Sequence, residues 1–102
     1  ERVPSEQIAY CKAAGDYVEL YLDGKKEILF SGNLKELELQ LPATFLRVHR
    51  SYSVNIDYIQ SLSSQSTRQK NVASAGGFLT LKGDYEVPVS RRIMPQVRNA
   101  LK

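Results

Sequence analysis

The stretch Phe45-Leu46-Arg47-Val48-His49-Arg50-Ser51-Tyr52-Ser53-Val54-Asn55-Ile56-Asp57-Tyr58-Ile59 decides how the rest of the chain is interpreted. Both of its ends are apolar enough for strands, but the basic, hydrogen-bonding cluster Arg47–Tyr52 interrupts the pattern. Arg offers a planar fork of donors that suits phosphate and the guanine edge, and Ser, Tyr and His add further donors. The stretch therefore predicts a cluster of hydrogen-bond donors at the surface, held by strands that are anchored in the core. The alternative is an Arg-rich turn that contacts only solvent.

Length and composition fit one domain. The chain has 102 residues, 42% of them hydrophobic, which suffices for a modest core. It contains no apolar run near the roughly 20 residues that span a bilayer, and its first residues do not resemble a signal peptide. We therefore expect a cytoplasmic domain. The full-length protein could still carry a membrane anchor elsewhere in its sequence. The start Glu1-Arg2-Val3-Pro4 lacks Met, which suggests a piece of a longer protein.

Cysteine and histidine are too scarce for metal or nucleophilic chemistry. One Cys, Cys11, cannot form an internal disulfide, and together with a single His it offers too few ligands for a zinc site. His49 beside Ser51, or with Cys11, could supply a base and a nucleophile, but no third group to orient them is evident. We predict no catalytic residues, no cofactor, no metal and no small-molecule substrate.

Charge is distributed unevenly along the chain. Residues 1–40 carry five basic and eight acidic side chains, a net charge of −3, whereas residues 41–102 carry nine basic and three acidic ones, a net charge of +6. A basic half of this kind indicates a polyanionic partner, although ordinary domains also show such asymmetry.

Short strands dominate the first part of the chain. Ile8–Cys11 and Tyr17–Leu22 have the alternation typical of strands, and Ala14–Asp16 separates them as a turn. Asp23-Gly24 suits a tight hairpin because both residues tolerate positive φ, and Lys26–Phe30 is the returning strand. The pattern predicts antiparallel hairpins.

One short helix follows these strands. Asn33 and Glu36 form a capping-box pattern, and Leu34, Leu37 and Leu41 recur at helical spacing before a proline. We expect this helix to pack on the body of the domain, because two turns are too short for a leucine zipper.

Further strands occupy the second part. Ile56–Leu62, Phe78–Leu81 and Tyr85–Val89 are predicted strands, and the last should lie at a sheet edge because Pro88 cannot donate to a ladder. Between the first two lies Ser63–Ser74, which has the composition of a long loop.

A second helix closes the chain. Ile93, Val97 and Leu101 share one face at four-residue spacing, and Ser90 can cap the helix. Because Pro95 suits a first turn, we expect a helical turn after Ser90 and the regular helix from about Pro95. Together these elements predict a mainly β domain of short antiparallel hairpins with two short helices.

Two other turns match the chemistry of the opening stretch. Ser90-Arg91-Arg92 places donors between a strand end and a helix start, and the Lys12–Tyr17 segment could point outward beside both Arg clusters. Three separated turns are thus candidates for one polyanion-binding surface.

The motifs resemble those of the LytTR DNA-binding domain. The resemblance rests on Gly15-Asp16-Tyr17-Val18, Gly32-Asn33-Leu34-Lys35-Glu36-Leu37, the stretch from Phe45 to Asn55, and Val87-Pro88-Val89-Ser90-Arg91-Arg92, in this order. It covers the chain from about Ser5 to Leu101. It implies an elongated β fold over residues 1–102, DNA recognition by loops in the major groove, and a place at the C-terminus of a bacterial response regulator.

The resemblance also implies roles for individual residues. Base contacts would come from Asp16, Arg50 and Arg91. The residues expected to contact the DNA backbone or support the motifs are Lys12, Tyr17, Arg47, His49, Ser51, Tyr52, Asn55, Ser90 and Arg92. Asp16 departs from relatives with His or Asn and could accept from a cytosine amino group or only shape its turn.

Further expectations concern the partners. Family members typically bind imperfect direct repeats in double-stranded promoter DNA as pairs, which implies a homodimer on DNA and a preceding receiver or sensor domain. Ser63–Ser74 looks like an enlarged family hairpin, either a tolerated insertion or a further backbone contact through Arg68 and Lys70. The alternative function is a regulatory β module that binds an acidic protein partner.

Overall fold

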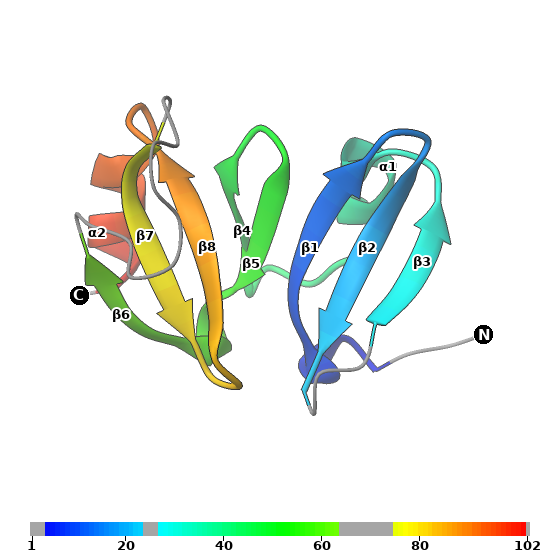
Figure 1. Ribbon diagram of the computed structural model, residues 1–102, viewed down its shortest axis with the longest axis horizontal. Helices are drawn as coiled ribbons and strands as arrows, with labels where there is room; N and C mark the ends of the chain where they lie inside the picture. Colours follow the sequence, from blue (N-terminus) through cyan, green and yellow to red (C-terminus); the bar gives the residue numbers. More distant parts are fainter. Residues whose placement is uncertain (1–3, 24–26, 64–74, 102) are drawn as a thin grey trace.

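Two antiparallel sheets make up most of the molecule, which is described by a computed structural model for residues 4–23, 27–63 and 75–101. The first sheet has five strands in the order β3-β2-β1-β5-β4, and the second has three in the order β6-β7-β8 (Figure 1). Along its principal axes the molecule measures 36 × 26 × 23 Å, so it is moderately elongated. The predicted mainly β class with two short helices is confirmed.

The described residues form eight strands, two α-helices and two 3₁₀ turns. In chain order they are η1 (Ser5–Gln7), β1 (Ile8–Ala14), β2 (Tyr17–Leu22), β3 (Glu27–Ser31), α1 (Leu34–Glu38), β4 (Phe45–His49), β5 (Tyr52–Asn55), η2 (Ile56–Tyr58), β6 (Ile59–Ser63), β7 (Ala75–Leu81), β8 (Tyr85–Ser90) and α2 (Met94–Ala100). The predicted hairpin is confirmed, because β2 pairs antiparallel with β3 from Tyr17↔Ser31 to Tyr21↔Glu27, but Gly24 of its turn lies outside the described residues. Nearly all of the predicted loop at Ser63–Ser74, including Arg68 and Lys70, also lies outside them.

The first sheet is covered on one face by α1. The predicted capping box is present: Glu36 N–H donates to Asn33 Oδ1 (2.7 Å), and Asn33 N–H donates to Glu36 Oε1 (2.9 Å). The helix ends at Glu38, before the predicted limit at Leu41. Beneath it two residues of β1 and alternate residues of β2 form one buried cluster with the helix: Ile8, Cys11, Val18, Leu20, Leu22, Leu34 and Leu37.

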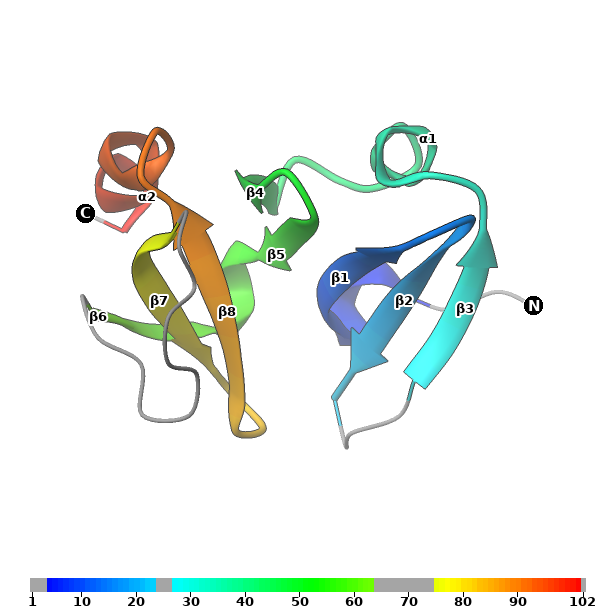
Figure 2. The same cartoon turned by 45° about the horizontal axis from the view of Figure 1, so that its top comes forward.

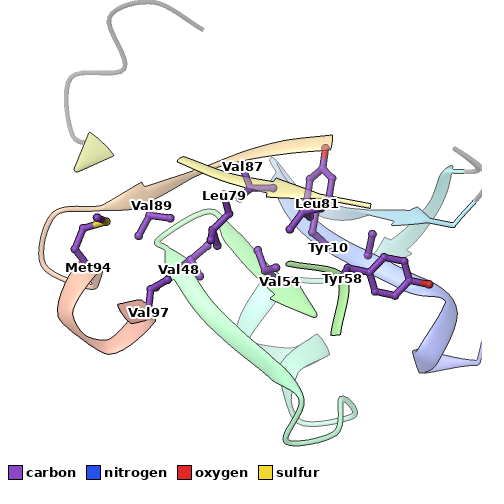
Figure 3. Close-up of a cluster of buried hydrophobic side chains, with 11 residues drawn as sticks. Tyr10, Val48, Val54, Tyr58, Leu79, Leu81, Val87, Val89, Met94 and Val97 are labelled. Atoms are coloured by element: carbon purple, nitrogen blue, oxygen red, sulfur yellow. The ribbon is translucent and has the colours of Figure 1, made fainter. Parts of the chain in front are cut away.

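The opposite face of the first sheet packs against the second sheet. Figure 3 shows this cluster, to which β1, β4, β5, β7, β8 and α2 all contribute. Its members are Ala9, Tyr10, Val48, Val54, Tyr58, Leu79, Leu81, Val87, Val89, Met94 and Val97. The strands β4 and β8 therefore lie beside each other although they belong to different sheets.

Tyrosine rings line the contact between the sheets. Tyr10 stacks on Tyr21 with ring centroids 4.6 Å apart, and Tyr85 from the second sheet meets Tyr10 edge-on at 5.2 Å. The Tyr85 hydroxyl donates to the carbonyl oxygen of Leu22 at 2.8 Å. This hydrogen bond joins the two sheets directly.

Two local predictions are wrong. The predicted strand Ile56–Leu62 begins with the 3₁₀ turn η2, because the Asn55 side chain accepts from Asp57 N–H (3.0 Å) and caps that turn. Ser90 does not cap α2: the N-cap is Ile93, and no side chain caps it. The carbonyl of Ser90 instead accepts from Ile93 N–H (3.0 Å) within the preceding turn.

Two proline predictions are confirmed. Pro88 lies in β8, an edge strand of the second sheet, where a missing N–H leaves the ladder intact. Pro95 lies in the first turn of α2, after the non-regular turn formed by Arg91, Arg92 and Ile93.

Candidate nucleic-acid interface

Three turns lie along one long edge of the molecule. They are Gly15-Asp16 between β1 and β2, Arg50-Ser51 between β4 and β5, and Arg91–Ile93 between β8 and α2. All three are at the upper edge in Figure 1, and Figure 2 shows them spread along the longest axis. The side chains of Asp16, Arg50 and Arg91, predicted to contact bases, are exposed there.

The first turn is held by the backbone conformation of Gly15 and by a hydrogen bond from Gly32, which follows β3. Gly15 has φ of +64°, which a side chain would disfavour. Gly32 N–H donates to the carbonyl oxygen of Asp16 at 3.1 Å. Next to the turn, Tyr17 is 45% exposed and Lys12 is half-buried. The turn thus presents one acceptor, Asp16, beside one cation and one phenol.

The second turn is bonded to the first hairpin. Ser51 accepts a hydrogen bond through its carbonyl oxygen from Ala13 N–H at 2.8 Å, and Lys12 lies opposite Tyr52 where β1 pairs with β5. Within the turn, Ser51 N–H donates to His49 Nδ1 at 3.2 Å. These bonds fix the turn from which Arg50 projects.

His49 is held in a neutral form. Burial lowers the pKa of the imidazole below 6.5, and the nearby positive charge of Arg50 lowers this pKa further. Because Nδ1 accepts from Ser51 N–H, the ring proton is assigned to Nε2. The ring also meets Tyr52 edge-on with centroids 5.5 Å apart. The prediction that His49 supports this turn fits its contacts.

The third turn is packed against β7. A Cβ atom at Gly76 would lie 2.8 Å from Arg91 Cα and 2.9 Å from Arg91 Cγ, so the backbone of β7 approaches the turn very closely. Sequence reasoning missed this role of Gly76. The Gly76-Gly77 pair was the available signal, because glycine in a strand often marks a close approach of backbone.

A pocket lies between the second and third turns. It has a volume of about 520 Å³ and is lined by His49, Arg50, Ser51, Ser90 and Arg92. Arg50 and Arg92 are exposed, whereas the other three residues are half-buried. The structure thus brings together two basic clusters that are forty residues apart in the sequence.

Two of the residues predicted to contact the DNA backbone or support the motifs do not belong to this edge. Arg47 lies in the middle of β4 and forms an ion pair with Glu38 of α1 (Nη1 to Oε1, 3.2 Å). Asn55 is buried at the far end of β5, where its Nδ2 donates to the carbonyl oxygen of Ile8 at 3.0 Å. Both have internal partners, which fits a supporting role better than contact with a ligand.

A metal-ligand cluster is missing from residues 4–23, 27–63 and 75–101. These ranges contain no group of three or more His, Cys, Asp or Glu side chains that could hold a metal ion. No helix among the same residues is both long and apolar enough to cross a membrane. Cys11 is buried, and burial raises the pKa of its thiol to about 12, with a further contribution from Glu38.

Comparisons with known proteins identify the family and the fold of the chain. The model of the LytTr DNA-binding domain family matches residues 1–102. Among four matching chains of solved structures, one is described as the LytTr DNA-binding domain of a proposed methyl-accepting/DNA response regulator from Bacillus cereus. It has a TM-score of 0.77 and 25% identity, and the match covers 97% of this chain and 84% of that chain. A search of curated proteins found no match.

The family match covers the entire sequence, including all three turns of the edge. It supports DNA binding and transcription regulation as the activity of the chain, and it points to no enzyme family. The chain belongs to the family of LytTR DNA-binding domains.

Proposed function

We propose that the chain recognises specific sequences in double-stranded DNA by inserting its three turns into the major groove along one face of the duplex. The single observation that supports this proposal most is the alignment of Asp16, Arg50 and Arg91 on exposed turns of one edge, spread along the longest axis (Figures 1 and 2). A row of turns can follow a duplex, whereas a compact patch would contact only a few base pairs.

The proposed roles follow from donor and acceptor chemistry. Arg50 and Arg91 each present a planar fork that can bind O6 and N7 of guanine, and Asp16 can accept from the amino group of cytosine. Phosphate contacts or support come from Lys12, Tyr17, His49, Ser51, Tyr52, Ser90 and Arg92. Arg47 and Asn55 support the strands through their bonds to Glu38 and Ile8.

We also propose that the domain is the output part of a longer bacterial regulator and acts in pairs on imperfect direct repeats. The relative from Bacillus cereus is described as part of a response regulator, which supports the first statement. The resemblance of the motifs supports the second. A receiver or sensor domain would then precede residues 1–102, and two copies would meet on the DNA as a homodimer.

The test begins with selection of bound duplexes from a random pool, followed by affinity measurements on the selected site and on unrelated DNA. We expect Arg50→Ala and Arg91→Ala each to cost about 1–3 kcal/mol at the selected site and to relax its sequence preference. Lys82→Ala is the matched control, because Lys82 is an exposed cation in the β7–β8 turn at the opposite edge (Figure 1).

Two outcomes would contradict the proposal. An equal loss on selected and unrelated DNA would show that both arginines contact phosphates and not bases. Failure to bind any duplex at low salt would reject DNA recognition by this edge and favour the alternative, a β module that binds an acidic protein.

A further inference from the structure

Two polar atoms beneath α1 are buried and have no hydrogen-bond partner among the described residues. They are Nε of Arg47 in β4 and Oγ of Ser53 in β5. Ser53 as a whole is fully buried, with 0% of its surface exposed. Buried polar groups in folded proteins nearly always have a partner, either from the protein or from an ordered water. These two atoms therefore need a partner that the described side chains and backbone do not supply.

Strand pairing brings the two atoms close together. Ser53 lies directly opposite Arg47 where β5 pairs with β4, and directly opposite Cys11 where β5 pairs with β1. Residues opposite each other in antiparallel strands have their side chains on the same face, with Cβ atoms about 4.5–5.5 Å apart. Cys11 belongs to the cluster that α1 covers, so this row of three side chains lies on the face of the sheet that the helix covers.

The chemistry of the row favours a small neutral molecule. Arg47 Nε is a donor, whereas the Ser53 hydroxyl can both donate and accept. The guanidinium charge is already paired with Glu38, because Arg47 Nη1 lies 3.2 Å from Glu38 Oε1. An anion in the row would add a buried negative charge without a cation of its own. A water molecule accepts from Nε–H, bonds to the hydroxyl and brings no charge.

Cys11 supplies a weaker third partner. Burial raises the pKa of its thiol to about 12, and the charge of Glu38 contributes to this increase. The side chain is therefore a neutral thiol at neutral pH, which is a weak donor and a weak acceptor. Internal waters typically make two to four hydrogen bonds, and the row offers three groups for them.

We propose that one internal water molecule is bound between Arg47 and Ser53, with the Cys11 thiol beside it. The Nε–H of Arg47 donates to the water oxygen, and the water donates to Ser53 Oγ. The water links β4 to β5 and β1, and the ion pair of Arg47 with Glu38 extends this link to α1. It thus stiffens the base of the hairpin that presents Arg50, and it is independent of the proposed DNA contacts.

Magnetic relaxation dispersion of the water oxygen signal tests the site, because it counts the waters that stay bound much longer than surface waters. We expect Ser53→Val to lower this count by one, since a methyl group replaces the hydroxyl and fills the space of the water. Arg47→Met should also lower it by one, because the methionine lacks the Nε–H group. A crystal structure of the unmodified chain should show a water oxygen within about 2.7–3.2 Å of both Arg47 Nε and Ser53 Oγ.

Two matched variants should leave the count unchanged. Glu38→Gln removes the ion pair but keeps both polar atoms of the site, and Ser61→Val makes the same change as Ser53→Val at an exposed position of β6. Thermal unfolding shows whether each variant is folded. Arg47→Met alters a side chain that is partly exposed, so it carries the test if Ser53→Val does not fold.

Two results would overturn the water site. An unchanged count in folded Arg47→Met and Ser53→Val would show that both polar atoms find partners within the protein. An anomalous peak between Arg47 and Ser53 in crystals grown with bromide would identify a halide in place of water. Either result would leave the proposed DNA recognition standing, because the selection of duplexes tests that proposal separately.

Discussion

Gly76 controls the position of the turn that carries Arg91. A Cβ atom there would meet Arg91 Cα at 2.8 Å, and a backbone atom cannot rotate out of the way. We expect Gly76→Ala to lower the free energy of unfolding by roughly 1–3 kcal/mol in urea denaturation. The variant should also bind the selected duplex more weakly under conditions in which it is fully folded.

The control for this prediction is Thr80→Ala, which alters the same strand away from the turn. If folded Gly76→Ala protein bound DNA as tightly as the unmodified chain, the third turn would not depend on its contact with β7.

His49 makes stability depend on pH in a defined direction. Its pKa is lowered in the folded chain, so the folded state binds fewer protons than the unfolded state, in which the pKa is near 6.5. The stability contribution is complete above about pH 6.5 and is lost as the pH falls below that value. Protonation also removes the acceptor for Ser51 N–H.

Urea denaturation at about pH 7.5 and 5.5 tests this expectation. The unmodified chain should lose more stability across this range than His49→Gln, whose side-chain oxygen can accept without titrating. Equal losses would assign the pH dependence to other groups.

The helix α1 protects the thiol of Cys11 although it has only five residues. Its capping box fixes its start, and Leu34 and Leu37 pack into the cluster that contains Cys11. We expect Asn33→Ala to cost roughly 0.5–2 kcal/mol, because the N–H of Glu36 loses its acceptor. Labelling of Cys11 by a disulfide reagent should accelerate, since the buried thiol with a pKa of about 12 reacts only after opening.

Lys35→Ala on the same helix is the control, because Lys35 is exposed. If Asn33→Ala lowered global stability but left the labelling rate unchanged, α1 would not be the cover that limits access to Cys11.

Elements with strong local signals were predicted well, whereas features that depend on distant contacts were not. Tyr17–Leu22 forms a strand with the predicted bounds, and the side chains of Asn33 and Glu36 make both predicted capping bonds. The strand predicted from Ile56 was wrong because the Asn55 side chain competes for the backbone with the ladder.

In the candidate site, too, single residues could be predicted from the sequence, whereas their arrangement in space could not. The motif residues Asp16, Arg50 and Arg91 could be selected from the sequence, but their common edge depends on how the two sheets pack. The pocket joins residues near 50 to residues near 90 through contact of β4 with β8, and no periodicity in the sequence reports such a contact. The buried position of Asn55 likewise depends on its bond to Ile8, 47 residues away.

A hydrogen bond from Tyr85 to Leu22 joins the two sheets, and it can be removed without changing the shape of the Tyr85 ring. Tyr85→Phe deletes the hydroxyl that donates to Leu22, and we expect a loss of about 0.5–1.5 kcal/mol in the free energy of unfolding. Tyr17→Phe, which removes the same atom from an exposed side chain, should have a smaller effect. If Tyr85→Phe were neutral in urea denaturation, this hydrogen bond would add nothing to the packing that holds the sheets together.

The length of the molecule limits how much DNA one copy can contact. Its longest dimension is 36 Å, close to one helical turn of B-DNA at about 34–36 Å, and the three turns are spread along it (Figure 2). Hydroxyl-radical footprinting should therefore show protection of roughly ten base pairs for each bound copy. Protection of twice that length at one copy per duplex would contradict binding along this edge.

The hydrogen bond from Ala13 to Ser51 places the first two turns in one sheet, while the third turn belongs to the other. The spacing between the first two turns is thus set by backbone pairing, which side-chain substitutions alter little. The distance to the third turn is set by side-chain packing at residues such as Val48 and Val89. If the three turns contact DNA as proposed, we expect substitutions buried in this core to change the length of the preferred operator without replacing any residue that meets the DNA.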